Sequence, residues 1–176
     1  MLVNTVSIPL LATMKKLLLS LFLLVSIISY SQETTTFILV RHAEKADDGT
    51  KNPPLTEEGV MRANEFAELL ASTNVSAIYS TDYNRTQQTV AVLAASKDQD
   101  ILSYGWGDPK GMLKKMLETH AGGTVVISGH SNTTPTLANI LLGEEKFQPF
   151  DDEDYGNILI LIVTEIGKSG LIHLRY

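Results

Sequence analysis

The chain has 176 residues, of which 44% are hydrophobic and 19% charged, so it can bury one core and is too apolar to be disordered throughout. It contains no cysteine, which excludes a disulfide scaffold, an iron–sulfur cluster, cysteine-ligated zinc and a cysteine nucleophile. The net charge of −6 argues against a protein that binds nucleic acid through a basic surface. A small anionic ligand remains compatible with this charge, because a few arginines in one cleft can determine the local field.

The N-terminal segment has the layout of a secretory signal. Lys15 and Lys16 form its positive region, an apolar run covers 17–28, and small residues occupy the −3 and −1 positions before a cleavage point after residue 31. A membrane anchor is the alternative, but this run is shorter than the roughly 20 residues that cross a bilayer. The uncharged stretch before Met14 adds nothing that a signal needs, so Met14 is favoured over Met1 as the translation start.

Two segments with different roles are therefore expected. We assign 1–31 to an N-terminal extension with a secretory signal and 32–176 to a single domain. No cysteine follows the apolar run, so a lipid attachment site is excluded. The product should be exported, to the periplasm or the medium, without a stable membrane span after signal cleavage.

In chain order, the first element of the domain is an apolar strand at 36–40, which ends abruptly at Arg41 and His42. A polar loop follows, and Thr56 then caps a helix whose apolar positions, Val60 among them, recur at helical spacing until it ends near residue 72. A buried strand that opens directly into charged residues is typical of a strand whose carboxyl end borders a site.

The middle of the domain repeats this alternation. A strand is predicted at 75–79 and a helix at 82–95, which places Arg85 in the first turn of that helix. Asp108 and Pro109 are a cap and first position for a further helix that ends at residue 120.

The last third starts with a buried strand at 124–128, which ends at Gly129 and His130 and leads into a helix over 133–142. Two more strands, 157–164 and 170–175, are joined by a glycine-containing turn. The regular alternation of strands and helices predicts a three-layer α/β/α sandwich with a mostly parallel central sheet.

Two strands thus end in histidines, and two arginines follow strands of the same predicted sheet. The carboxyl ends of parallel strands meet at one edge, so His42 and His130 can be neighbours although they are far apart in sequence. Guanidinium groups bind phosphoryl oxygens in a planar, bidentate manner, and an imidazole can act as a nucleophile. Singly, each of these residues is more simply explained as structural, so the hypothesis depends on their combination.

Four segments in this order resemble the histidine phosphatase superfamily, which is related to phosphoglycerate mutases and acid phosphatases. They are LVRHAEK at 39–45, LTEEG at 55–59, IYST at 78–81 with RTQQT at 85–89, and SGHSNT at 128–133. Ala43 stands where many members have glycine, which is a small departure.

The resemblance implies a two-step phosphoryl transfer. His42 would be the nucleophile that forms a phosphohistidine, and Arg41, Arg85 and a protonated His130 would bind the phosphoryl oxygens. No metal and no cofactor is implied, and the partner is a small phosphorylated substrate. Asn132 either adds a neutral hydrogen bond to the substrate or serves as a turn or helix cap.

The proton donor for the leaving group stays open. Glu44, Asp108 and Asp82 are the candidates, but Glu44 is equally explained as an ion-pair partner of Lys45 or Arg62, and Asp108 as a helix cap. Glu44 is retained as a substrate contact. Without an acid, substrates with good leaving groups, such as aryl or acyl phosphates, are favoured.

Other features are interpreted as structural or as weaker alternatives. Trp106 is expected to cover the core rather than line a pocket, His120 and His173 lack a third metal ligand, and the acidic run at 151–154 is expected to be a solvated loop. The competing functions are a non-catalytic module that binds a phosphorylated ligand or a partner, a mutase, and a serine hydrolase on Ser131.

Overall fold

The computed structural model describes residues 13, 15 and 33–176. The chain divides into two units, Met1–Gln32 and Glu33–Tyr176, and the second contains the six strands and four helices of the domain. The predicted signal over 1–31 lies outside the described residues apart from positions 13 and 15, so it stays a prediction. Within the described part of the chain, no helix is long and apolar enough to cross a membrane.

A mixed sheet forms the centre of the domain, in the strand order β3-β2-β4-β1-β5-β6. The four strands β3, β2, β4 and β1 are mutually parallel, whereas β5 runs antiparallel to β1 and β6 antiparallel to β5. The strands are β1 (Thr35–Arg41), β2 (Ala77–Ser80), β3 (Ile101–Ser103), β4 (Thr124–Gly129), β5 (Asn157–Glu165) and β6 (Lys168–Arg175).

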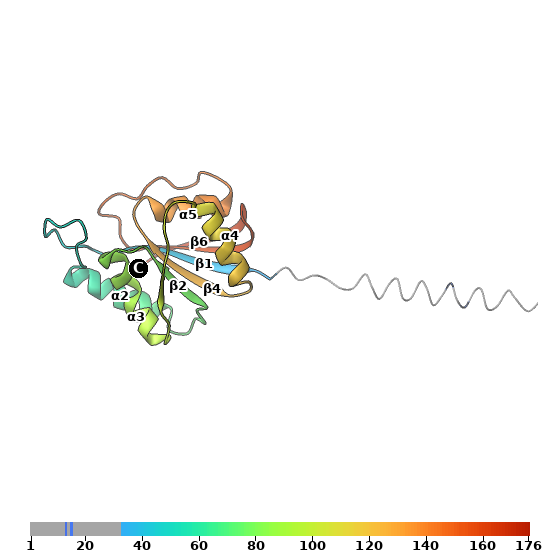
Figure 1. Ribbon diagram of the computed structural model, residues 1–176, viewed down its shortest axis with the longest axis horizontal. Helices are drawn as coiled ribbons and strands as arrows, with labels where there is room; N and C mark the ends of the chain where they lie inside the picture. The colour runs from blue at the N-terminus through green and yellow to red at the C-terminus, as the bar shows by residue number, and fades with distance from the viewer. Residues whose placement is uncertain (1–12, 14, 16–32) are drawn as a thin grey trace, which may run out of the picture. The chain divides into compact units, whose positions relative to one another are not determined.

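Helices cover both faces of this sheet (Figure 1). One core cluster joins β1 and β4 to α2 (Glu57–Leu69) and α3 (Asn84–Ser96), and Phe66 and Leu93 are fully buried in it. The other cluster joins the opposite face to α4 (Pro109–Thr119) and α5 (Thr133–Leu142). The predicted α/β/α sandwich with a mostly parallel sheet is confirmed.

Two helices, α2 and α4, begin where the sequence places caps. The Thr56 side chain accepts a hydrogen bond from the Gly59 amide at 3.0 Å, and Asp108 accepts one from the Gly111 amide at 2.9 Å. Each cap satisfies one of the amides that the first turn of a helix leaves unpaired. These local interactions explain why the starts of α2 and α4 are predictable.

Several boundaries differ from the prediction. The edge strand β3 was missed because it has only three residues, none of them buried. The helix expected from residue 82 begins at Asn84, and the helix expected to end near residue 72 ends at Leu69. Val60, expected on the core face, is 48% exposed, because α2 instead turns Gly59, Ala63, Phe66 and Ala67 inward.

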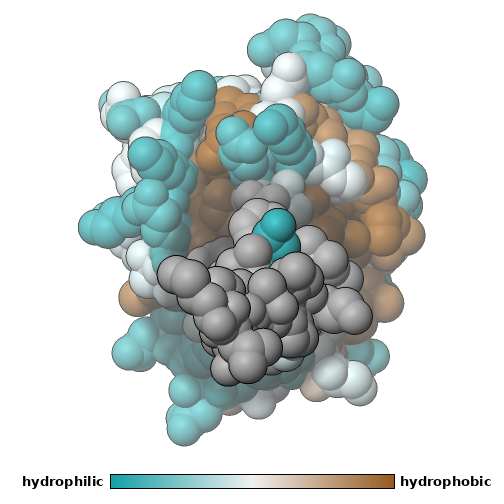
Figure 2. All heavy atoms as spheres, turned by 90° about the vertical axis from the view of Figure 1, so that its right-hand side faces the viewer, coloured by the Kyte–Doolittle hydropathy of each residue, from teal (hydrophilic) through white to brown (hydrophobic). Residues whose placement is uncertain are grey.

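The β5–β6 end of the sheet carries exposed apolar side chains. Ile162, Ile172 and Leu174 are each between 41% and 48% exposed. Apolar surface is also visible between polar side chains on the face of the molecule that Figure 2 shows. Scattered exposed apolar residues are common on soluble proteins, so we assign no role to these positions.

Candidate active site

The register of β1 and β4 brings the two strand-end histidines together. Arg41 pairs with Gly129 at the last position of the ladder, and the His42 amide then donates to the Gly129 carbonyl at 2.9 Å. The next residue on each strand is therefore a histidine, and the centroids of the rings of His42 and His130 lie 5.6 Å apart. The sequence prediction that these residues are spatial neighbours agrees with this geometry.

The His42 ring is held in one tautomer. Its Nδ1 lies 2.8 Å from the Ala43 carbonyl oxygen, which can only accept a hydrogen bond, so Nδ1 carries the hydrogen and Nε2 the lone pair of the neutral ring. The Ala43 amide in turn donates to Thr89 Oγ1 at 2.9 Å, which ties this segment to α3. Nε2 is thus the atom of His42 that is prepared for nucleophilic attack.

Burial keeps His42 neutral. The residue is 4% exposed, and this desolvation lowers the pKa of the imidazole to about 3, with smaller contributions from the positive charges of Arg41 and Arg85 and from His130. The hydrogen bond to Ala43 acts in the opposite direction. At neutral pH the imidazole therefore keeps its lone pair.

His130 is also neutral in the free protein. Burial, followed by the charges of Arg85 and Arg41, lowers its pKa to about 4. An Arg85 amino group, which can only donate, lies 3.4 Å from Nδ1, and Thr81 Oγ1 lies 2.9 Å from Nε2. Burial and two nearby guanidinium groups thus favour the neutral ring while no anion is bound, and the protonated His130 expected with a bound phosphoryl group stays a prediction.

The acidic loop after α5 holds Arg41 in place. One terminal nitrogen of Arg41 donates to the carbonyls of Asp151 and Asp154 at 2.6 and 3.2 Å, and the other donates to the Asp152 carbonyl at 2.9 Å. The guanidinium also lies 4.2 Å from the centre of the Tyr155 ring. The acidic run is a loop with exposed side chains at 151–153, as predicted, but its backbone also binds a residue of the candidate site, which the sequence did not indicate.

Each arginine has one buried donor without a partner. The Nε–H groups of Arg41 and Arg85 are buried and have no hydrogen-bond partner among the described residues. A buried cationic donor without a partner is costly, and an anion is the ligand that satisfies it best. These two groups, together with His42 and His130, make an arrangement suited to a phosphoryl group.

Glu44 pairs with Arg62 and not with Lys45. Arg62 donates to both carboxylate oxygens, from Nε at 2.8 and 2.9 Å and from a terminal nitrogen at 2.6 Å, and both side chains are largely buried. The sequence left a role in substrate contact and an ion-pair role open for Glu44, and the structure shows the ion pair. This pair joins the residue that follows Ala43 to α2.

The three candidate proton donors occupy different places. Asp108 caps α4, as the sequence allowed, and Glu44 is bound by Arg62. Asp82 lines a cavity of about 390 Å³ together with Arg85 and His130, and its carboxylate accepts a hydrogen bond from Gln87 at 3.2 Å. Asp82, the third choice from sequence, is thus the only one of the three that borders this cavity.

Asn132 and Trp106 line the same cavity. Asn132 precedes α5 but its side chain makes no capping hydrogen bond, so the alternative of a helix cap is not what the structure shows. Trp106 is 40% exposed, and the expectation that it covers the core is wrong, because the loop after β3 places it at the cavity wall.

Three positioning residues were missed by sequence reasoning: Thr81 at His130, Thr89 at Ala43, and Tyr155 at Arg41. Thr81 and Thr89 lie within the motif segments 78–81 and 85–89, and this position near Arg85 in the sequence could have indicated a role in the site. Tyr155 carries no such signal, because its contact with Arg41 spans most of the domain.

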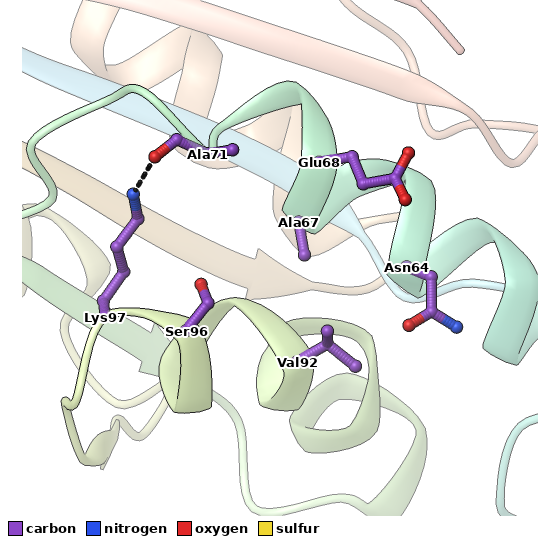
Figure 3. Close-up of a pocket in the computed structure, with 7 residues that line it drawn as sticks. All are labelled: Asn64, Ala67, Glu68, Ala71, Val92, Ser96 and Lys97. Carbon is purple, nitrogen blue, oxygen red and sulfur yellow. Dashed lines mark hydrogen bonds between the residues drawn. The ribbon is translucent and has the colours of Figure 1, made fainter.

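A second cavity, of about 260 Å³, lies between α2 and α3 (Figure 3). Ala67, Ala71 and Val92 give it apolar walls, and Lys97 Nζ closes one end by donating to the Ala71 carbonyl at 2.7 Å. None of the histidines or arginines of the candidate site lines it. Among the described residues, no group of three or more histidine, aspartate or glutamate side chains is arranged to hold a metal ion.

A family model matches the part of the chain that contains the first three motif segments. Residues 37–103 match the family model described as histidine phosphatase superfamily (branch 1), in agreement with the resemblance of the first three motif segments. The match covers β1 to β3 and includes His42 and Arg85, whereas His130 follows it in the chain. No curated protein matches the chain significantly.

Solved structures share the fold over most of the chain. A phosphoserine phosphatase from Entamoeba histolytica, in complex with 3-phosphoglyceric acid, is 20% identical with a TM-score of 0.63, over 81% of this chain and 97% of that one. A mycobacterial glucosyl-3-phosphoglycerate phosphatase is 13% identical with a TM-score of 0.68, over 81% and 99%. The protein histidine phosphatase SixA, complexed with tungstate, is 14% identical with a TM-score of 0.65, over 80% and 96%.

Proposed function

We propose that this chain is a member of the histidine phosphatase superfamily (branch 1), a phosphatase that hydrolyses phosphomonoesters or related phosphoryl compounds through a phosphohistidine on His42. The observation that carries the proposal is the His42 ring, neutral, buried and held by Ala43 so that Nε2 has the lone pair. The phosphatases among the structural neighbours support the same reaction class.

In the first step, Nε2 of His42 attacks phosphorus. The new N–P bond forms as the P–O bond to the leaving group breaks, and the leaving oxygen departs with the electron pair. A basic leaving group also needs a proton, for which Asp82 is the carboxyl group at the cavity wall.

In the second step, water attacks the phosphohistidine, the N–P bond breaks, and inorganic phosphate leaves with the neutral imidazole restored. Arg41 and Arg85 offset the charge on the phosphoryl oxygens through their remaining Nε–H donors. A phosphoryl dianion beside His130 favours the protonated ring, so protonation of His130 accompanies anion binding in this mechanism. No step requires a metal, because these groups supply the positive charge.

We also propose that the protein acts after export. The support is the positive region, apolar run and small residues of the segment before residue 32, as the sequence presents them. Size comparison of the expressed and the mature protein by mass spectrometry tests this point. Unprocessed protein that is found only in the cytoplasmic fraction contradicts it.

The test of the activity is hydrolysis of para-nitrophenyl phosphate by the purified protein in the presence of EDTA. The wild type should turn over, and His42→Ala should lose the activity. His173→Ala is the matched control, because His173 is an exposed residue of the edge strand β6 and does not line the cavity. Rapid quenching with labelled substrate should trap a phosphoryl group on the wild type that is labile in acid and stable in base, as a phosphohistidine is.

Two results separate the alternatives. Turnover that needs a divalent metal, or that survives His42→Ala, contradicts the phosphohistidine mechanism. A folded protein that binds vanadate without turnover or phosphoenzyme supports the alternative of a non-catalytic module that binds phosphorylated ligands.

A further inference from the structure

Two exposed aromatic side chains line the cavity beside His130 and Arg85. Tyr83 precedes α3 and is 41% exposed, and Trp106 lies in the loop between β3 and α4 and is 40% exposed. They come from separate segments of the chain and share this one cavity of about 390 Å³. Neither residue belongs to the phosphoryl-binding set described above.

Tyr83 is oriented by that set. Its ring meets the His130 ring edge to face, with centroids 5.1 Å apart and planes at 88°, and the Arg85 guanidinium lies 4.5 Å from its centre. These contacts hold the phenol ring beside the groups that bind the phosphoryl oxygens. Whatever extends from phosphorus into this cavity therefore meets an ordered aromatic wall.

The position of the aromatic residues determines which part of a substrate they contact. In the proposed mechanism Arg85 and His130 bind the phosphoryl group, so a leaving group that extends from it into the cavity meets Tyr83 and Trp106. Exposed aromatic rings favour planar, unsaturated partners, on which they stack with a specific geometry. Apolar alkyl groups or polyols gain less from such walls.

From this geometry we infer that Tyr83 and Trp106 select substrates with a planar, aromatic leaving group, such as the phosphate esters of phenols. The inference rests on the proposed function and narrows its substrate class. In the first step the P–O bond to the aryl group breaks and the phenolate departs with the electron pair. A phenolate is weakly basic, so an aryl substrate depends less on protonation by Asp82, the one candidate acid that borders the cavity.

The kinetic test compares two substrates with good leaving groups, only one of which is aromatic. Trp106→Ala should lower kcat/KM for para-nitrophenyl phosphate about tenfold, as expected from the loss of one aromatic contact, and change that for acetyl phosphate less than about twofold. Trp106→Phe should restore most of the aryl preference. Met61→Ala, which removes an exposed side chain on α2 outside the cavity, should change neither value.

A binding test is independent of turnover. Trp106 is the only tryptophan of the chain, so the protein's tryptophan fluorescence reports on this cavity alone. Phenylphosphonate should change this emission at concentrations at which methylphosphonate does not, in the wild type and in His42→Ala. Thermal denaturation verifies that each variant is folded before it is compared.

The outcomes distinguish this inference from the proposed function. Equal loss on both substrates in Trp106→Ala, or the same emission change with both phosphonates, overturns the aromatic selection even if the protein is an active phosphatase. No turnover and no phosphoenzyme overturns the proposed function, and the fluorescence titration then still decides whether the cavity prefers an aryl group.

Discussion

Acidification should destabilise the domain through the two histidines of the candidate site. Burial lowers the pKa of His42 to about 3 and that of His130 to about 4, whereas a histidine in the unfolded chain titrates near 6.5. Between these values the unfolded state binds protons that the native state does not. The contribution is therefore fully present above about pH 6.5 and is lost progressively as the pH falls toward the folded pKa values.

The magnitude follows from the distance to the unfolded pKa. At about pH 5 each histidine is about 1.5 pH units below it, and at about 1.4 kcal/mol per unit each lowers the free energy of unfolding by about 2 kcal/mol. The value is the same for any folded pKa well below 5, so it depends on burial of the neutral ring and not on the folded pKa itself. Both together remove about 4 kcal/mol, a large part of the stability of a typical domain.

Urea denaturation at neutral pH and at about pH 5 measures this loss. The His42→Asn variant keeps a polar side chain that does not titrate, so it should lose about 2 kcal/mol less than the wild type over this pH interval. His173→Asn, an exposed histidine on β6, is the control for the substitution itself. If the wild type and His42→Asn lose the same stability, His42 is not held neutral by burial and the argument for a prepared nucleophile fails.

Three further predictions concern the charged residues around the site. Asp82→Asn should lower kcat for alkyl phosphates by about 10² or more and leave aryl phosphates almost unchanged if Asp82 is the acid, and equal effects in the two rate assays exclude that role. Glu44→Gln should reduce the free energy of unfolding by about 1–3 kcal/mol in urea titrations, because Arg62 loses a charged partner. It should have little effect on kcat, and a large fall in kcat at unchanged stability contradicts the structural role of Glu44. Arg41→Lys should weaken vanadate binding about 10-fold or more in a calorimetric titration. The reason is that an ammonium group cannot donate to the loop carbonyls and also offer an Nε–H to the anion. Unchanged affinity would show that Arg41 does not bind the anion.

The parts of the fold that follow from neighbouring residues were predictable from sequence. The buried strands β1 and β4 are apolar runs that end at Arg41 and Gly129, and the helix caps Thr56 and Asp108 bind amides three residues away. Because parallel strands align their carboxyl ends, these local patterns also placed His42 and His130 at one edge of the sheet. The strand β3 escaped this reasoning, since three partly exposed residues have no periodicity.

The charge state of the site required the tertiary structure. A protonated His130 is a reasonable expectation from the phosphoryl chemistry, but the pKa of its ring is set by burial and by the guanidinium groups around it. Arg85, in the first turn of α3, and Arg41, at the end of β1, both place positive charge near His130. A sequence states which groups titrate, whereas the surroundings decide at which pH they do so.

The sequence by itself therefore determined the alternation of elements, the nucleophile candidate and the two arginines, because each depends on interactions within one segment or on the geometry common to parallel sheets. Only the tertiary structure decided which groups the charged side chains of the site bind. Glu44 pairs with a residue 18 positions away, and Arg41 binds carbonyls about 110 positions away. Such contacts depend on how loops close over the finished sheet, and no local pattern of residues encodes that closure.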